Sequence, residues 1–189
     1  VHRMFRDIKS FTVTVPQLPS GEKVYEKEDY PEIDVSDSRE EIIRKVKSAS
    51  GYSEMALLSL YAYRDMEAAD WRPFIKAAME RNPVCHSFIQ GKSPEEIYKT
   101  VSGLKNKSVY DGGRLSQPDE VWNFHRGDGA EKALLMADAL LHNNPDGHIE
   151  IKLNGDTAVL NFAGTDFSFE TVKGYSRNIS IRGYNYTVR

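Results

Sequence analysis

The sequence has few of the features that identify secreted, membrane-spanning or nucleic-acid-binding proteins. Cys85 is the only cysteine among the 189 residues, so no internal disulfide can form. No apolar run reaches the roughly 20 residues that a membrane-spanning helix needs. The net charge is −3, whereas a nucleic acid or an anionic membrane would require a basic surface. We therefore predict no nucleic-acid partner and no membrane span.

The start of the chain has no long apolar centre of the kind found in signal peptides. Export would have removed such a segment, so the compartment stays open between the cytoplasm and an exported location.

Metal-binding spacing is also missing. Four of the five histidines, His86, His125, His142 and His148, belong to no H-x-x-x-H, H-E-x-x-H or C-x-x-C pattern. We therefore predict neither a metal nor another cofactor. Cys85 adjoins His86 in the apolar stretch VCHSFI, where adjacent side chains diverge, so a buried core thiol is favoured over a nucleophile.

The first 36 residues differ from the rest of the chain. Residues 10–15 alternate and predict a strand. Residues 16–36 contain three prolines and many acidic side chains, which indicates an extended arm. We divide the chain into this N-terminal strand and arm, 1–36, and an α+β domain, 37–189, although the two can also be one domain overall.

Helix signals dominate the middle of the chain. Capping boxes begin at Ser38 and at Ser93, and Ser53 is a further N-cap. The strongest helix is predicted at residues 129–142. Asp128 is its N-cap, Glu131 completes a capping box, and the apolar residues that follow recur at spacings of three and four, which places them in a stripe on one face.

Alternating residues dominate the end of the chain. Residues 143–147, NNPDG, break the helix, and the segments HIEIKLN, TAVLNF, DFSFETV, NISIRG and NYTVR then alternate as strands do. Helices followed by an antiparallel sheet indicate the α+β class. We expect a helical N-terminal half packed on a C-terminal antiparallel sheet, with the helix at 129–142 in the centre.

Residues 117–141, QPDEVWNFHRGDGAEKALLMADALL, resemble the central motif of the transglutaminase-like superfamily, the papain-like group that includes bacterial cysteine hydrolases. In that family a short helix leads to a turn whose cysteine caps a buried helix, and a histidine and an aspartate come from following strands. Arg126, Gly127, Asp128 and Glu131 match this pattern, as do the apolar residues after them.

The resemblance implies a degenerate catalytic site, because the position of the family's cysteine is Gly129. His148 corresponds roughly to the family's histidine, and Asn161 or Asp166 to the group that orients it. If the ancestral arrangement persists, we expect His148 to face Gly129 across a small cleft, with Asn161 or Asp166 behind it. The residues by themselves favour a simpler interpretation of His148, as a histidine that opens a strand.

The turn at residues 126–129 has a second interpretation, as an anion site. Free N–H groups at a helix start and the Arg126 guanidinium attract anions. The Asp128 carboxylate would occupy the same donors as a cap. Capping is therefore favoured, and Arg126 and Asp128 are kept as candidate binding residues.

From these features we predict a non-catalytic transglutaminase-like module, a pseudoenzyme that binds a peptide, a glycan or a protein partner in the remnant cleft. One alternative is an active hydrolase or acyl-transferase of the cysteine-hydrolase type, with a nucleophile that no motif identifies. Another is an accessory domain of a longer protein.

Overall fold

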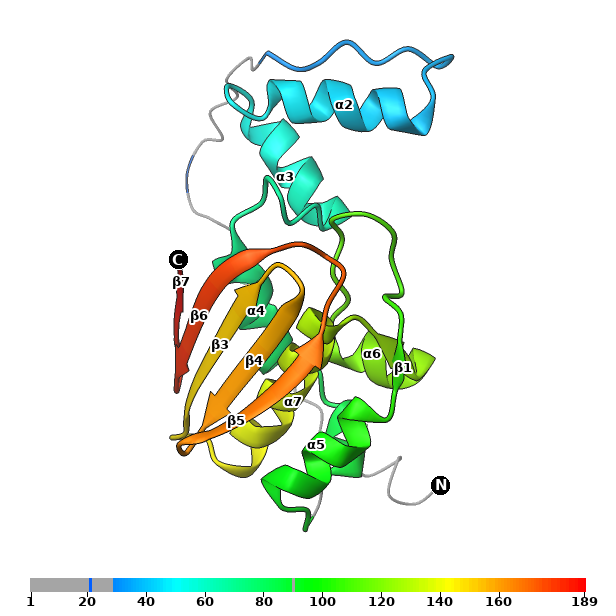
Figure 1. Ribbon diagram of the computed structural model, residues 1–189. Helices are drawn as coiled ribbons and strands as arrows, with labels where there is room; N and C mark the ends of the chain where they lie inside the picture. Colours follow the sequence, from blue (N-terminus) through cyan, green and yellow to red (C-terminus); the bar gives the residue numbers. More distant parts are fainter. Residues whose placement is uncertain (1–20, 22–28, 90) are drawn as a thin grey trace, which may run out of the picture.

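The computed structural model describes residues 21, 29–89 and 91–189. The predicted strand at 10–15 and most of the arm at 16–36 lie outside these residues. Residues 29–36 are described and contain no helix or strand. Within the described ranges the fold is α+β, as predicted from the change of periodicity after residue 143 (Figure 1).

In the part of the chain that the structure describes, six α-helices and one 3-10 helix precede the main sheet. Serines, aspartates and one glutamine are the N-cap residues of the α-helices, and the capping boxes predicted at Ser38 and Ser93 are both formed. The helices are α2 (Arg39–Ala49), α3 (Glu54–Tyr63), α4 (Trp71–Glu80), η1 (Cys85–Phe88), α5 (Pro94–Ser102), α6 (Pro118–Phe124) and α7 (Gly129–Asn143).

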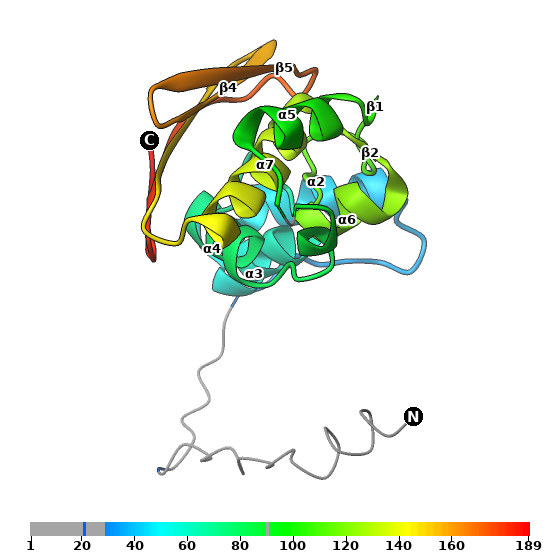
Figure 2. The ribbon, with the colours of Figure 1, turned by 90° about the horizontal axis from the view of Figure 1, so that it is seen from below.

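Five strands form an antiparallel sheet in the order β5-β4-β3-β6-β7. The strands are β3 (His148–Asn154), β4 (Thr157–Phe162), β5 (Thr165–Glu170), β6 (Ser176–Arg182) and β7 (Asn185–Val188). Buried and exposed residues alternate along β3, the central strand. The sheet therefore has one apolar face that packs on the helices and one face turned to solvent (Figure 2).

Helix α7 occupies the core. It packs against β3, β4 and β5 on one side and against α4, α5 and α6 on the others. Every residue from Gly129 to Leu141 is buried. The predicted apolar stripe is therefore too narrow, because α7 is buried on all sides and not only on one face. Its buried polar side chains have partners: Glu131 accepts from the Ser116 backbone N–H at 2.8 Å, and the Lys132 ammonium donates to the Leu104 carbonyl at 2.6 Å.

The predicted tight turn before α7 takes a different form. His125 adopts the left-handed conformation, with φ 50°, and ends α6. Arg126–Gly127 is then the short strand β2, which pairs in parallel with β1 (Lys105–Asn106). The chain therefore turns at His125, one residue before the turn predicted at residues 126–129, because pairing with β1 keeps Arg126 and Gly127 extended.

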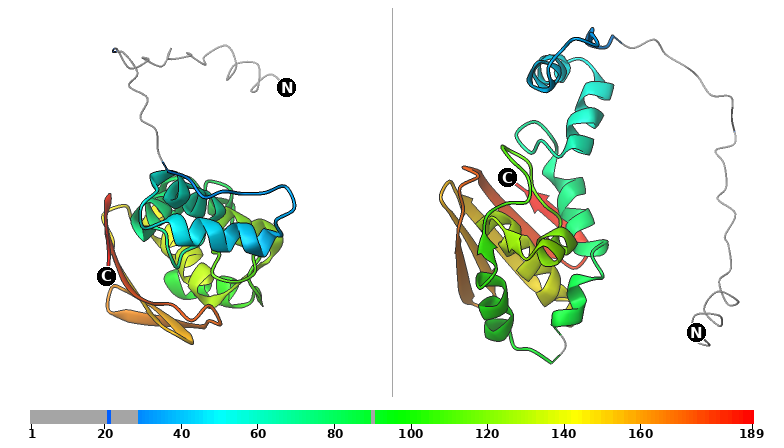
Figure 3. Two further views of the ribbon diagram at one scale, coloured as in Figure 1. Left: turned by 90° about the horizontal axis from the view of Figure 1, so that it is seen from above. Right: turned by 90° about the vertical axis from the view of Figure 1, so that its right-hand side faces the viewer.

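Helices α2 and α3 lie at one end of the molecule, beyond the end of the sheet (Figure 3). They pack on each other. Among the described residues, no helix has the length and apolar character needed to cross a bilayer. The end of α3 contacts the body of the domain, where Arg114 donates to the Tyr63 carbonyl at 2.9 Å and Tyr61 packs against the core.

Candidate functional site

Gly129 begins α7 directly beneath the end of β5. A Cβ atom at this position would lie 2.2 Å from the carbonyl oxygen of Glu170 and 2.6 Å from its carbonyl carbon. Such contacts are far inside van der Waals distance. The backbone of β5 therefore fills the space that a nucleophilic side chain would need, and the small cleft expected above Gly129 is not formed.

His148 lies at the opposite end of α7 from Gly129. The helix between them has 15 residues, which at 1.5 Å per residue amounts to roughly 20 Å. The strand register agrees, because Glu170 pairs with Thr157 at one end of the sheet, and Ile149 pairs with Phe162 at the other. The expectation that His148 faces Gly129 is wrong: the first strand after α7 begins where the helix ends.

The solvent-facing side of the sheet carries the other candidates. His148 Nε2 lies 2.9 Å from Glu150 Oε1. Asn161 donates to Asp166 Oδ1 at 2.6 Å across the β4–β5 pair. Asn161 and Asp166 therefore bind each other, while His148 has a different carboxylate as its partner. The four residues Gly129, His148, Asn161 and Asp166 do not form one site.

Asp128 acts as the N-cap of α7. Its carboxylate accepts from the backbone N–H of Ala130 at 3.1 Å and of Val172 at 2.8 Å, and from the hydroxyl of Thr171. The Asp128 carboxylate therefore takes the place of a bound anion, because it uses donors that the anion would need. Arg126 is half-buried, and its Nε has no hydrogen-bond partner among the described residues. The capping interpretation of Asp128 is confirmed.

Cys85 is 0% exposed and belongs to the hydrophobic core, as predicted from its apolar neighbours. Its Sγ lies 3.0 Å from Asp138 Oδ2 and 3.1 Å from the Asn82 carbonyl oxygen. Burial raises the pKa of this thiol, and the neighbouring Asp138 carboxylate raises it further. A thiol held protonated in this way is a poor nucleophile.

We therefore expect Cys85 to react with a chromogenic disulfide reagent only when the protein unfolds. Native proteins are unfolded in roughly one molecule per thousand or fewer, so labelling near neutral pH should be about 1,000-fold slower than in urea. The two rates are compared by stopped-flow absorbance. Native labelling as fast as in urea would place the thiol at the surface and revive Cys85 as a nucleophile.

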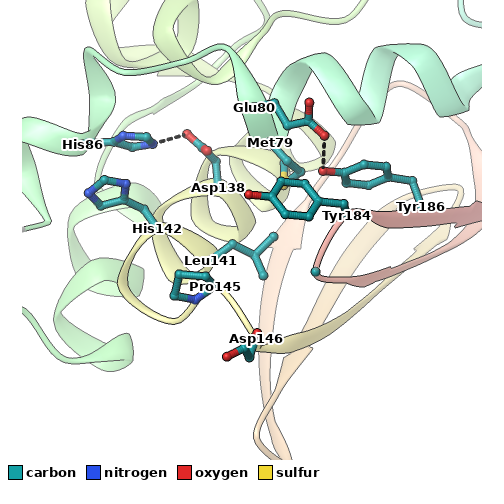
Figure 4. A pocket seen from close by; sticks show the side chains of 11 residues that line it. Met79, Glu80, His86, Asp138, Leu141, His142, Pro145, Asp146, Tyr184 and Tyr186 are labelled. Carbon is teal, nitrogen blue, oxygen red and sulfur yellow. Dashed lines mark hydrogen bonds and ion pairs between the residues drawn. The ribbon is translucent and has the colours of Figure 1, made fainter.

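A polar pocket lies beside Cys85, where η1, the second half of α7 and the β6–β7 turn meet (Figure 4). Asp138 is 1% exposed, and its Oδ2 lies 3.1 Å from His86 Nε2. The rings of His86 and His142 stack with their centroids 3.9 Å apart. Burial raises the pKa of Asp138 to about 6 and lowers that of His142.

The sequence motifs do not predict this pocket, because its residues are far apart along the chain. His86 and Asp138 are separated by 52 positions, and no spacing motif connects them. One weak signal was available. Asp138 lies four residues after Leu134 and three before Leu141, so the helical repeat that predicted the apolar face also places a carboxylate on it.

A second surface feature is the apolar side of α3. The helix sequence EMALLSLYAY is apolar almost all round, yet its only buried residues are Ala56 and Leu60. Leu57 and Leu58 remain 41% and 61% exposed. Helices that are apolar all round are normally buried. A hollow of about 660 Å³ runs between α3 and the start of α4, and it is lined by Glu54, Leu57, Leu58, Tyr61, Ala68, Ala69, Asp70 and Pro73.

We call this hollow the α3 groove. Its lining includes the carboxylates of Glu54 and Asp70 and no lysine, arginine or histidine. Asp70 is paired with Arg72, whose Nη2 lies 2.8 Å from Asp70 Oδ2. The α3 groove is therefore an aliphatic surface with the Glu54 carboxylate on its border, because the charge of Asp70 is compensated by Arg72.

Comparison with known proteins gives no relative for this chain. No protein-family model, curated protein or solved structure matches it.

Proposed function

We propose that this chain is a non-catalytic binding module of transglutaminase-like ancestry, and that the α3 groove binds an amphipathic helix of a protein partner. The observation that carries the proposal is the exposure of Leu57 and Leu58 on a helix that is apolar almost all round. A contiguous apolar surface of this kind marks interaction sites in soluble proteins.

Three observations support the absence of thiol catalysis. The cysteine position of the motif is Gly129, which the Glu170 backbone covers. Cys85 is buried, with its thiol pKa raised. His148 lies at the far end of α7 from Gly129. An active cysteine hydrolase or acyl-transferase needs a thiolate beside its base, so these positions favour the binding module over the enzyme.

The lining of the α3 groove favours a protein segment over a glycan. Sugars are usually held by aromatic faces together with polar groups, whereas Tyr61 is the single aromatic residue here and leucine, alanine and proline make up most of the wall. Apolar residues at positions i, i+3, i+4 and i+7 of a helix fit such a groove. The Glu54 carboxylate favours lysine or arginine on the border of that helix.

The proposal is tested with a synthetic amphipathic peptide that carries leucines at i, i+3, i+4 and i+7 and lysines on both borders. We expect the wild-type chain to bind it in fluorescence anisotropy, and the double variant Leu57→Ser, Leu58→Ser to bind it at least about 10-fold more weakly. One buried leucine contributes roughly 1.5–3 kcal/mol, and about 1.4 kcal/mol corresponds to a factor of ten.

Two controls make the result specific. Val35→Ser removes an exposed aliphatic side chain that precedes α2 and does not line the α3 groove, so it should leave the affinity unchanged. A peptide with glutamates in place of the lysines should bind more weakly, because Glu54 would repel it. Equal binding by the double variant would refute the α3 groove as the site. A wild-type dimer that the double variant turns into a monomer would identify a second copy, and not a partner, as the occupant.

A further inference from the structure

His86 and Asp138 line the polar pocket of Figure 4, and the Cys85 sulfur lies 3.0 Å from Asp138 Oδ2 on the buried side. We propose that Cys85, His86 and Asp138 form a binding site for a divalent transition-metal cation, with Zn²⁺ as the best fit. The three side chains come from η1 and from α7. The expectation that Cys85 and His86 diverge is wrong, because both contact Asp138 where η1 packs on α7.

The geometry of the three donors suits one ion. The Cys85 sulfur, a His86 ring nitrogen and an Asp138 carboxylate oxygen all lie within 4.8 Å of one another. Around a tetrahedral Zn²⁺, ligand atoms lie about 2.0–2.3 Å from the metal, which separates them from each other by less than about 4 Å. Two of the three donor pairs, Sγ–Oδ2 at 3.0 Å and Nε2–Oδ2 at 3.1 Å, already lie within that range, and the sulfur–imidazole pair is at most 4.8 Å apart.

The type of donor selects the metal. A thiolate with an imidazole and a carboxylate is typical of zinc and cobalt, whereas magnesium and calcium prefer oxygen donors alone. The surroundings are acidic as well. Glu80 and Asp146 line the same pocket, which contains no lysine or arginine. Asp119, which accepts from the backbone N–H of Cys85 at 2.8 Å, adds a further negative charge.

The pocket supplies an entry path and a free coordination position. Its volume is about 210 Å³, and His86 and Asp138 both line it. The side chain of His86 is 22% exposed, so the ion can approach from the pocket while Cys85 closes the buried side. Three protein ligands with water or another ligand in the fourth position is an arrangement found in open zinc sites. His142, stacked on His86, keeps that ring in its plane.

Binding exchanges protons for the metal. The Cys85 S–H bond breaks as the sulfur–zinc bond forms, and the thiol proton is released to the solvent. The His86 nitrogen that faces Asp138 gives up its hydrogen bond and binds with its lone pair, so in the neutral ring the proton resides on the other nitrogen. The Asp138 carboxylate exchanges the thiol and imidazole donors for the cation. No oxidation or reduction is involved.

The test uses the full chain, freed of metal by a chelator and kept reduced. Titration with Co²⁺ should give one equivalent of binding, a sulfur-to-cobalt charge-transfer band in the near ultraviolet, and intense visible bands of tetrahedral cobalt that Zn²⁺ abolishes. Cys85→Ser should lose the charge-transfer band. Asp138→Asn and His86→Gln should each weaken Zn²⁺ binding by about 100-fold or more, since loss of an outer-shell partner alone costs 10–100-fold.

His148→Gln is the matched control, because His148 is also paired with a carboxylate, Glu150, but on the solvent-facing side of the sheet. It should leave cobalt spectra and zinc affinity unchanged. His86→Gln changes a partly exposed side chain, so it tests the site even where a buried substitution alters the fold. A wild-type chain without the charge-transfer band would overturn the proposal. So would zinc binding that survives Asp138→Asn and His86→Gln but weakens in His148→Gln.

Discussion

Ala137→Asp is expected to prevent folding, because it places a further carboxylate inside the core without a partner, whereas the buried Glu131 and Asp138 of α7 both have one. Ala137 is fully buried on α7, the helix that contacts the sheet on one side and α4, α5 and α6 on the others. An unpaired charge in such a position destabilises a protein by roughly 3–5 kcal/mol, which is much of the total stability of an average domain. Urea unfolding followed by circular dichroism should show little or no native baseline for this variant.

Ala62→Asp provides the matched control. Ala62 is exposed on α3, so the same substitution should change the free energy of unfolding by about 0.5 kcal/mol or less. The comparison separates the effect of burial from that of adding a carboxylate to a helix. If Ala137→Asp melts within a few degrees of wild type, Ala137 is at the surface and α7 is not the central helix.

Local signals explain why so much of this fold could be predicted. A capping box is formed by residues three positions apart, so it predicts a helix start from local sequence alone. The boxes at Ser38, Ser93 and Asp128 are of this kind. The alternation along residues 148–154 similarly requires only that one face of the strand be covered. Both patterns are complete within a few residues, and the structure forms both.

Contacts between distant segments explain what could not be predicted. The helical repeat in α7 indicates one buried face but contains no information on whether another element covers the opposite face. That cover comes from residues such as Ser116 and Leu104, which satisfy Glu131 and Lys132. The pocket around Asp138 could not be predicted from the sequence either, because Cys85 and His86 contact Asp138 from a distant part of the chain.

The role of Gly129 could not be predicted from the motif, because it depends on a strand that is distant in the sequence. The sequence indicated correctly that no thiol is present there, and the resemblance suggested a space where the thiol had been. The end of β5, more than 40 residues later, occupies that space with its backbone. A glycine at a helix start therefore has a packing role here, since the absence of a Cβ allows the carbonyl of Glu170 to approach α7.

Gly129→Cys should consequently destabilise the fold and fail to restore a reactive site. Its Cβ would meet the backbone of Glu170 at 2.2 Å, and backbone atoms cannot rotate aside as a side chain can. Overpacking of a core usually costs 1–3 kcal/mol, and a clash with a strand backbone belongs at the upper end, at about 3 kcal/mol. Urea unfolding measures this loss. Iodoacetamide labelling with peptide mapping, which distinguishes the new thiol from Cys85, measures reactivity.

Gly51→Cys is the matched control, because a Cβ at Gly51 meets nothing within 4 Å. That variant should keep wild-type stability and react like free cysteine. The thiol introduced by Gly129→Cys should react more slowly than the one at position 51, since the free N–H groups of the helix start lower a thiol pKa only where the thiolate can form beside them and be reached. Here Asp128 and the β5 backbone occupy that place. A Gly129→Cys protein that is as stable as Gly51→Cys and reacts faster would show that β5 does not cover the first turn of α7, and the remnant-cleft interpretation would then replace the packing role given to Gly129.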